Sequence, residues 1–251
     1  MMREKLVFGP IHSRRLGSSL GINLLPEEGK LCNFDCIYCE CGWNADGTGD
    51  KRLPTVSELD ETLRGVLESC RRAGTPIDSI TFSGDGEPTL HPDFPAMIDV
   101  TLALRDAYFP QAKVSVLSNA TRAGIPAVRD ALKKVDNPIL KLDAATTALA
   151  RKINRPVGAY QVEDVVKSLE AFEGSFVLQT MFLRTDSINS LDPENLRGWM
   201  DIVRRLKPRE VMVYTVDRET PLKGIQKVSP EEMAAAVQPL VEEGFQIQIR
   251  G

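Results

Sequence analysis

The sequence predicts an α/β fold with a parallel sheet, in the form of a partial (β/α)6 barrel of the TIM type. After residue 50, amphipathic helical stretches alternate with short runs rich in β-forming residues, which is the rhythm of repeated β/α units. About six such units can be read, whereas a closed (β/α)8 barrel takes about 250 residues for its repeats alone. Because no linker or low-complexity tract interrupts the alternation, we expect a single domain over residues 1–251.

The strands are predicted from short runs of β-forming residues bounded by turn residues. The candidates are Ser19–Leu24, Ile77–Phe82, Lys113–Leu117, Pro138–Leu142, Ser175–Leu183 and Glu210–Tyr214. We expect Phe245–Arg250 to add an edge strand at the end of the sheet.

The helices between these strands have readable starts, stops and buried faces. In the helix that Gly74 ends, apolar residues recur at helical spacing, and Cys70 belongs to that core stripe. Ser229 and Glu232 form a capping box around a proline at the first helical position of another helix. The inward faces of the last two helices are expected to carry Leu196, Met200, Val203, Met233, Val237, Leu240 and Val241.

Composition favours a cytoplasmic protein without disulfides and without membrane contact. Hydrophobic residues make up 42% of the chain and charged residues 26%, which is the balance of a globular protein. No apolar run approaches the ~18 residues of a membrane span, and the N-terminal run lacks a signal-peptide core. The formal net charge is −4 and no basic tail is present, so a general electrostatic attraction to nucleic acid is not expected.

Three of the five cysteines, Cys32, Cys36 and Cys39, lie in the run C-N-F-D-C-I-Y-C, within a loop over residues 30–42. Three thiolates this close suit a [4Fe–4S] cluster with one open iron, because each iron normally takes one protein thiolate. On spacing alone, a structural zinc site completed by Cys41 or His12 and ordinary buried thiols stay open as alternatives. No second C-x-x-C or H-x-x-H is present, which favours the cluster over zinc.

The spacing C-x3-C-x2-C, with the aromatic Tyr38 before the last cysteine, resembles the signature of the radical S-adenosylmethionine (SAM) superfamily. Residues 9–26 and the later run F-S-G-D-G-E-P-T-L-H-P resemble a subgroup similar to the wyosine synthases of transfer RNA. I-N-R-P at 153–156 and V-Y-T-V-D-R-E-T-P at 213–221 also resemble that subgroup, so the similarity covers most of the chain. The resemblance implies that the three cysteines ligate a cluster, that SAM binds its open iron, and that Cys41 is not a ligand.

The run Gly84-Asp85-Gly86-Glu87 follows a predicted strand, at the end where β/α barrels carry their reactive groups. Its glycines allow a ligand to approach the backbone closely, and its glutamate can accept hydrogen bonds from an ammonium group. A turn or cap role is the alternative for such residues. Placed after the cysteines, the run resembles the G-G-E element that holds the methionine amino group of SAM. Asp85 stands where that element has its first glycine.

The resemblance places further residues at the SAM site. Ser118 and Asn119 match a position that contacts the ribose or the methionyl carboxylate. Asp143, at another strand end, suits contact with the ribose or the substrate. Tyr38 matches a residue whose backbone and ring hold the adenine.

Several other residues have weaker support. Gln179 and Arg155 are candidates for the site, with structural roles as alternatives. The arginines within His12–Arg15 suit carboxylate or phosphate groups, with a role in closing the barrel or in surface ion pairs as the alternative. His91 is expected to order its loop.

The resemblance implies an oxidoreductase or lyase that reductively cleaves SAM at a [4Fe–4S] cluster to generate a 5′-deoxyadenosyl radical. We expect an electron donor such as flavodoxin or ferredoxin, and a small metabolite or cofactor precursor as substrate. One alternative is a wyosine-like enzyme that modifies transfer RNA, which the acidic charge and the lack of further N-terminal cysteines disfavour. Another is a non-catalytic metal-binding protein.

Overall fold

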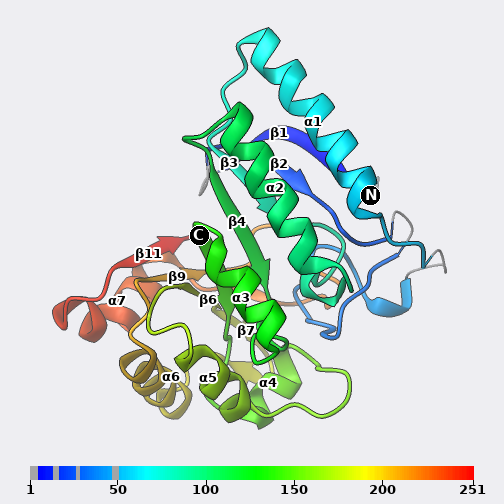
Figure 1. The fold of residues 1–251 in the computed structure, drawn as a ribbon. Coiled ribbons are helices and arrows are strands. Elements are labelled where there is room, and N and C mark those ends of the chain that lie inside the picture. Colours follow the sequence, from blue (N-terminus) through cyan, green and yellow to red (C-terminus); the bar gives the residue numbers. More distant parts are fainter. Residues whose placement is uncertain (1–4, 14–16, 27–28, 47–50) are drawn as a thin grey trace. The chain divides into compact units, whose positions relative to one another are not determined.

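The computed structural model describes residues 5–13, 17–26, 29–46 and 51–251. Helices alternate with parallel strands, so the fold class is α/β, as the sequence predicted (Figure 1). The chain divides into two compact units, which are described separately, and the single domain stays a prediction. One unit comprises residues 1–32, 44–118 and 125–138, and the other comprises residues 33–43, 119–124 and 139–251.

In the first unit the strands are ordered β1-β2-β3-β4. Their bounds are Val7–Ser13 for β1, Gly17–Ile22 for β2, Ser79–Phe82 for β3 and Lys113–Ser118 for β4. β1 is antiparallel to β2, whereas β2, β3 and β4 pair in parallel. The sequence predicted β2, β3 and β4. It missed β1, because the Gly9-Pro10 pair inside that strand is typical of a turn.

The helices of this unit are α1 (Val56–Ala73), α2 (Phe94–Tyr108) and α3 (Pro126–Lys134), with short 3-10 helices η1 (Asn44–Asp46) and η2 (Pro88–Leu90). α1 and α2 pack against each other (Figure 1). Thr55 and Glu58 form a capping box at the start of α1, and Gly74 ends it with a φ of 68°. Cys70 lies on the buried face of α1, as predicted.

In the second unit the main strands pair in parallel in the order β5-β6-β9-β11. Their bounds are Asn137–Lys141 for β5, Val177–Met181 for β6, Glu210–Tyr214 for β9 and Ile247–Arg250 for β11. The helices are α4 (Thr147–Ile153), α5 (Val162–Glu170), α6 (Pro193–Leu206) and α7 (Pro230–Glu242). Ser229 and Glu232 cap α7 as the sequence predicted, and β11 is the predicted edge strand.

A second, smaller sheet was not predicted. It has the order β10-β7-β8, from Gln226–Lys227, Leu183–Thr185 and Ile188–Asn189, and its strands are antiparallel. The single strand predicted over 175–183 is therefore divided, because β6 ends at Met181 and Leu183 already belongs to β7.

The predicted inward faces of α6 and α7 need correction. α6 buries Asn195, Trp199, Val203 and Leu206, while Leu196 and Met200 are only half-buried. The Trp199 indole sets this face, because it packs edge-to-face on Phe182 at a centroid distance of 5.4 Å. On α7, Val241 is 46% exposed, whereas Met233, Val237 and Leu240 are buried as expected.

The helices of the described ranges include none that is long and apolar enough to cross a membrane.

We predict that Thr180→Val lowers the free energy of unfolding by about 1–3 kcal/mol. The fully buried Thr180 hydroxyl accepts a hydrogen bond from Trp199 Nε1 at 3.0 Å and donates to the Leu142 carbonyl at 2.8 Å. Valine keeps the shape but leaves both buried partners unsatisfied. Denaturant unfolding measures the change, and the exposed helical Thr62→Val is the matched control. Equal effects of the two substitutions would contradict the prediction.

Candidate active site

The three cysteines of the predicted cluster loop, residues 30–42, which we call the cysteine loop, are divided between the two units. Cys32 lies in the first unit, and Cys36 and Cys39 lie in the second. Cys36 is buried, whereas Cys32 and Cys39 are half-buried. The Cys39 amide donates to the Cys36 carbonyl at 3.1 Å, and Gly42 donates to Cys39 at 3.0 Å, so two tight turns follow each other. A turn of this kind keeps the α-carbons of Cys36 and Cys39 within about 7 Å.

Leu31, the residue before Cys32, pairs with residues 84–87 of the first unit, which we call the glycine loop. Leu31 N donates to the Asp85 carbonyl at 3.0 Å, and Glu87 N donates to the Leu31 carbonyl at 3.0 Å. Gly86 has a φ of 142°, and a Cβ there would lie 1.9 Å from the Leu31 carbonyl oxygen. Only glycine fits this position. The structure therefore brings the predicted G-D-G-E run directly to the start of the cysteine loop.

Asp85, the departure from the G-G-E pattern, is held by Asn23. The Asn23 amide nitrogen donates to Asp85 Oδ2 at 3.2 Å, and Asn23 Oδ1 accepts from the Asp85 amide at 3.3 Å. Gly84 lies against the same asparagine, since a Cβ at Gly84 would be 2.6 Å from Asn23 Oδ1. Asn23 of the first unit thus holds both the Asp85 side chain and the glycine loop.

Glu87 and Ser118 are brought together, as their assignment to one site requires. Glu87 is 2% exposed. Its Oε1 accepts from Ser118 Oγ at 2.8 Å, from Thr89 Oγ1 at 2.5 Å and from Thr89 N at 3.1 Å. The carboxylate therefore also caps η2. The alternative cap role is therefore observed for this residue, and its place in a SAM site stays a prediction.

Asn119 belongs to the second unit and contacts the residue that follows Cys32. Its amide nitrogen donates to Asn33 Oδ1 at 2.7 Å, and its Oδ1 accepts from Thr121 Oγ1 at 2.7 Å. Asn33 closes the triangle by donating to Thr121 Oγ1 at 2.7 Å. This triangle links the loop after β4 to the cysteine loop within one unit.

Asp143 lies at the centre of a buried polar cluster with Tyr38 and Cys36, which we call the Asp143 cluster. The Tyr38 hydroxyl donates to Asp143 Oδ2, and the Asn154 amide donates to the same oxygen at 2.6 Å. Met181 N donates to Oδ1 at 2.9 Å, and Lys141 Nζ lies 3.6 Å from it. The structure thus unites Tyr38 and Asp143, which the sequence had assigned separately to the SAM site.

Two members of the Asp143 cluster, Lys141 and Asn154, were missed by the sequence analysis. Lys141 Nζ lies 5.1 Å from the centroid of the Tyr38 ring and also donates to the Tyr214 hydroxyl. The sequence contained a signal for Lys141, because Lys141 and Asp143 are two residues apart in an extended run and so share a face. Asn154 stood in the quoted motif I-N-R-P, but no rule gave its side chain a role.

Burial and charge shift the pKa values of this cluster. Burial, and then the Asp143 charge, raises the pKa of the Cys36 thiol to about 11, against the opposing effects of Lys141 and Asn154. Burial lowers the pKa of Lys141, but the Asp143 and Tyr214 charges outweigh it and raise that pKa overall. Burial and the Asp143 carboxylate also raise the pKa of Tyr38. The cluster is therefore a lysine–aspartate ion pair beside a neutral thiol and a neutral phenol.

The cysteine loop is braced by the segment that contains Asn154. Asp35 N donates to the Asn154 carbonyl and Ile37 N donates to the Ile153 carbonyl, each at 2.9 Å. Val157 N donates to the Asn33 carbonyl at 2.9 Å. I-N-R-P thus acts as a main-chain support for the cysteines.

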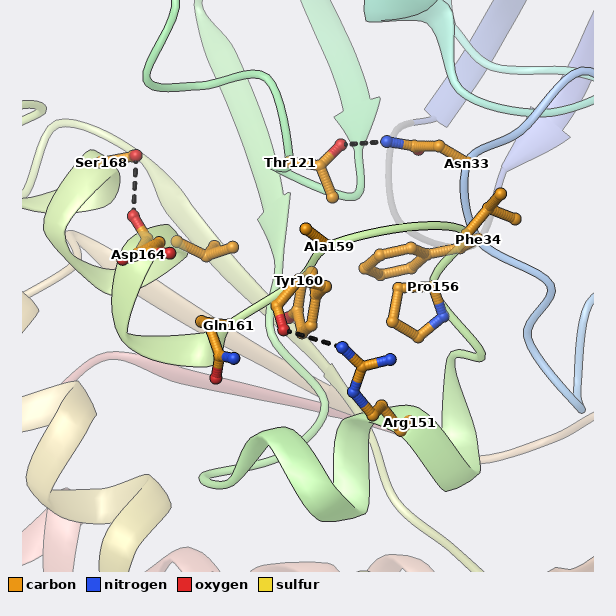
Figure 2. Close-up of a pocket in the computed structure, with 12 residues that line it drawn as sticks. Asn33, Phe34, Thr121, Arg151, Pro156, Ala159, Tyr160, Gln161, Asp164 and Ser168 are labelled. Carbon is orange, nitrogen blue, oxygen red and sulfur yellow. Dashed lines mark hydrogen bonds between the residues drawn. The ribbon is translucent and has the colours of Figure 1, made fainter.

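A pocket of about 410 Å³ in the second unit borders the cysteine loop, and we call it the loop pocket (Figure 2). Asp164 and Ser168 lie on one side of it and Asn33 and Phe34 on the other, with the Tyr160 ring between them. Its lining residues are Asn33, Phe34, Thr121, Arg151, Pro156, Val157, Ala159, Tyr160, Gln161, Asp164, Val165 and Ser168. Burial raises the pKa of Tyr160, and its ring packs edge-to-face on Phe34 of the cysteine loop at a centroid distance of 5.3 Å.

The remaining candidates have other surroundings. Arg155 lies over the Trp43 ring at 4.7 Å, and Gln179 is buried in β6. His91 accepts from the Asp93 amide at 3.1 Å and its other ring nitrogen lies 2.9 Å from the Pro54 carbonyl, which fits the predicted loop-ordering role. His12 is exposed, and Arg14 and Arg15 lie outside the described residues.

No disulfide joins any of the five cysteines, all of which lie in the described part of the chain. Over that same part, no three His, Cys, Asp or Glu side chains form a group that could hold a single metal ion.

Comparison with known proteins identifies the family. The family model of the radical SAM superfamily matches residues 29–206. A UPF0026 protein of Helicobacter pylori (strain J99) is 30% identical, over 93% of this chain and 73% of its own length.

Solved structures share the fold at low sequence identity. Streptococcus suis SuiB bound to S-adenosylmethionine has a TM-score of 0.65 at 14% identity, over 92% of this chain and 50% of SuiB. SuiB has also been solved with its precursor peptide SuiA, and this chain spans about half the length of SuiB. A TYW1 structure with a bound lysine-pyruvate adduct has a TM-score of 0.61 at 15% identity, over 92% of this chain and 76% of that one.

These likenesses confirm the predicted partial-barrel fold. The family uses a [4Fe–4S] cluster together with SAM, so the predicted cofactors are confirmed at the level of the family. The chain belongs to the radical SAM superfamily.

Proposed function

We propose that this protein is a radical SAM enzyme that holds its [4Fe–4S] cluster through Cys32, Cys36 and Cys39 and acts on a small molecule. The observation that carries the proposal is the pairing of Leu31 with residues 85–87. That pairing joins the cysteine loop to the glycine loop, which are the two sequence elements assigned to the cluster and to the SAM amino group. Bound together, the reduced cluster and SAM supply a one-electron cleavage that yields methionine and a 5′-deoxyadenosyl radical.

The donor set fits the cluster. Three thiols stand on one loop, with Cys36 and Cys39 separated by one tight turn. Because the pKa of the Cys36 thiol is about 11, it is protonated at neutral pH, and metal binding must displace that proton. The Lys141 ammonium lowers the pKa of the Cys36 thiol, but the Asp143 carboxylate that pairs with it has the larger, opposite effect.

Other residues of the chain position SAM. Glu87, fixed by Ser118 and Thr89, offers a carboxylate to the methionine ammonium group, as in the family element. Asp143 holds the Tyr38 hydroxyl, so the ring and backbone between the second and third cysteines are fixed for the adenine. In this proposal Asp143 acts on SAM through Tyr38 and Asn154, in addition to its predicted contact with the ribose or the substrate.

A small-molecule substrate is supported by the loop pocket and by charge. A volume of about 410 Å³ falls within the usual range for small-molecule sites, and both charged and aromatic groups line it. The net charge of −4 opposes non-specific attraction to a polyanion such as RNA. SuiB binds a precursor peptide, but its likeness to this chain is one of fold, so a peptide substrate is an outcome for experiment.

The proposal is tested by anaerobic reconstitution of the purified protein with iron and sulfide, followed by addition of SAM and a chemical reductant. We expect about four irons per chain and the appearance of 5′-deoxyadenosine. Cell extract separated into low-molecular-weight, peptide and RNA fractions is then added, and the first fraction is expected to increase the product. A protein that binds one zinc and no iron would overturn the enzyme assignment, and stimulation only by RNA or peptide would overturn the substrate class.

We predict that Cys32→Ala, Cys36→Ala and Cys39→Ala each reduce bound iron from about four per chain to background. Cys41→Ala and Cys70→Ala are the matched controls, since Cys41 follows the trio closely and Cys70 lies in the α1 core. Iron and labile sulfide analysis measures the change. Loss of the cluster in Cys41→Ala would contradict the assignment of the ligands.

We predict that Gly86→Ala also reduces cluster loading, although no ligand is changed. The new Cβ would lie 1.9 Å from the Leu31 carbonyl oxygen, so Leu31 and the adjacent Cys32 must move. Gly224→Ala is the control, because Gly224 also has a positive φ but its added Cβ meets no atom within 4 Å. Iron content and thermal melting measure both variants. If Gly86→Ala loads as much iron as Gly224→Ala, the two loops are not coupled.

We predict that Ala159→Trp suppresses the substrate-dependent part of 5′-deoxyadenosine formation and leaves the substrate-independent part unchanged. Ala159 is exposed and lines the loop pocket, so a large side chain fills the pocket without disturbing the core. Ala148→Trp is the control, since Ala148 is an exposed alanine beside a second pocket of about 660 Å³ in the same unit. Equal suppression by both variants would argue against the loop pocket as the substrate site.

A further inference from the structure

Asn154 has a buried side-chain amide that lies within hydrogen-bond distance of three acceptors. Asn154 is 2% exposed. Its side-chain nitrogen lies 2.6 Å from Asp143 Oδ2, 3.3 Å from the Tyr38 hydroxyl oxygen and 3.5 Å from the Cys36 sulfur. An amide nitrogen carries two hydrogens, so it serves three acceptors with two protons.

The distances show how those two protons are divided. The short bond to the charged Asp143 takes one of them. The other is left for the Tyr38 hydroxyl oxygen at 3.3 Å and the Cys36 sulfur at 3.5 Å. Tyr38 donates its own hydrogen to Asp143, so its oxygen competes only as a neutral acceptor. A thiolate at Cys36 would be the stronger acceptor, because it is charged.

The main chain fixes Asn154 independently of its side chain. Its carbonyl accepts from Asp35 N at 2.9 Å, and its own amide donates to the Ala150 carbonyl at 2.7 Å. The amide side chain is therefore held beside Cys36 by the backbone of the cysteine loop itself. A change of the side chain alone leaves these braces in place.

We propose that Asn154 is a positioning residue that donates an N–H···S hydrogen bond to the Cys36 thiolate when the cluster is bound, and so raises the reduction potential of the cluster. The inference rests on the proposed function, because it requires Cys36 to be a ligand. Reduction adds negative charge to the cluster and its sulfurs. A hydrogen bond to a ligand sulfur stabilises that charge, which makes reduction more favourable.

The same amide has a second effect through Asp143. Its hydrogen bond to Asp143 Oδ2 at 2.6 Å stabilises part of the negative charge that lies near the Cys36 sulfur. Removing the amide therefore removes an N–H dipole whose positive end faces the Cys36 sulfur. It also leaves the nearby Asp143 carboxylate with one hydrogen-bond donor fewer. Both changes disfavour the reduced cluster.

The test compares Asn154→Leu with Asn195→Leu. Asn195 is also a buried asparagine of the second unit, and it also makes strong bonds, accepting from Ala145 N at 2.9 Å and donating to the Ser190 carbonyl at 2.7 Å. Neither of its partners is a cysteine. Both variants are expected to melt at lower temperature than the unsubstituted protein, so thermal stability serves as the common background.

The informative readout is the midpoint potential of the reconstituted cluster, followed by electron paramagnetic resonance during a redox titration. For Asn154→Leu we expect about a tenfold fall in the ratio of reduced to oxidised cluster at a fixed solution potential, which is a negative shift of about 59 mV for one electron. Asn195→Leu is expected to keep the original potential. An unchanged potential in Asn154→Leu, with iron fully loaded, would overturn the inference.

A second measurement covers the case in which Asn154→Leu does not fold or load. The unsubstituted protein is labelled with ¹⁵N in its asparagine amides, and the reduced cluster is examined for hyperfine coupling to ¹⁵N. Coupling that persists in Asn195→Leu supports the N–H···S bond, and absence of coupling overturns it. The proposed function fails separately, since it requires iron loss in Cys36→Ala whatever the potential of the Asn154 variant.

Discussion

The cysteine loop depends on main-chain hydrogen bonds to segments far away in the sequence. Between Cys32 and Trp43 the structure has no helix or strand, so local ladders do not fix the backbone there. Leu31 instead pairs with residues 85–87, and residues 33–37 pair with residues 153–157. Since each residue held in one conformation costs about 1–2 kcal/mol of entropy, these distant bonds fix the backbone on either side of Cys32 within its own unit. Residues of either supporting segment can therefore act on the cysteines without touching them.

The buried charges of the second unit impose a further constraint. A carboxylate is costly to bury unless it is paired and hydrogen-bonded. Asp143 meets this condition with donors from Tyr38, Asn154 and the Met181 amide, in addition to the Lys141 ammonium. Each donor comes from a different segment, so the carboxylate ties the cysteine loop to the end of β5, to I-N-R-P and to β6. Such a connected network keeps a site in one geometry before any ligand arrives.

The sequence predicted what local patterns encode and missed what tertiary contacts decide. The central parallel strands, the Gly74 stop of α1 and the capping box of α7 follow from short-range signals, and the structure confirms them. β1 was missed because its Gly-Pro pair looks like a turn, and the face of α6 was misplaced because Trp199 chooses it through Phe182 and Thr180. At the site, the structure brings Glu87, Asn119 and Asp143 into contact with residues 31–38, and their roles stay predictions. Asn154 was missed because its contacts with Asp143 and Cys36 are tertiary, and the spacing of residues along the sequence does not reveal them.

The hydrogen bonds of Glu87 fix the carboxylate of a residue that we propose for SAM binding. Its Oε1 has two lone pairs but three donors within 3.1 Å, so the three bonds share them. The Thr89 amide belongs to the backbone of η2 and cannot turn away, whereas the Ser118 hydroxyl rotates freely about its C–O bond. In the proposed function, the Ser118 and Thr89 hydroxyls can each turn their hydrogens away and offer an oxygen to an ammonium group, whereas the Thr89 amide keeps its bond. The cap on η2 therefore fixes the direction of the carboxylate, and the two hydroxyl donors make that direction compatible with the charged ligand that we propose.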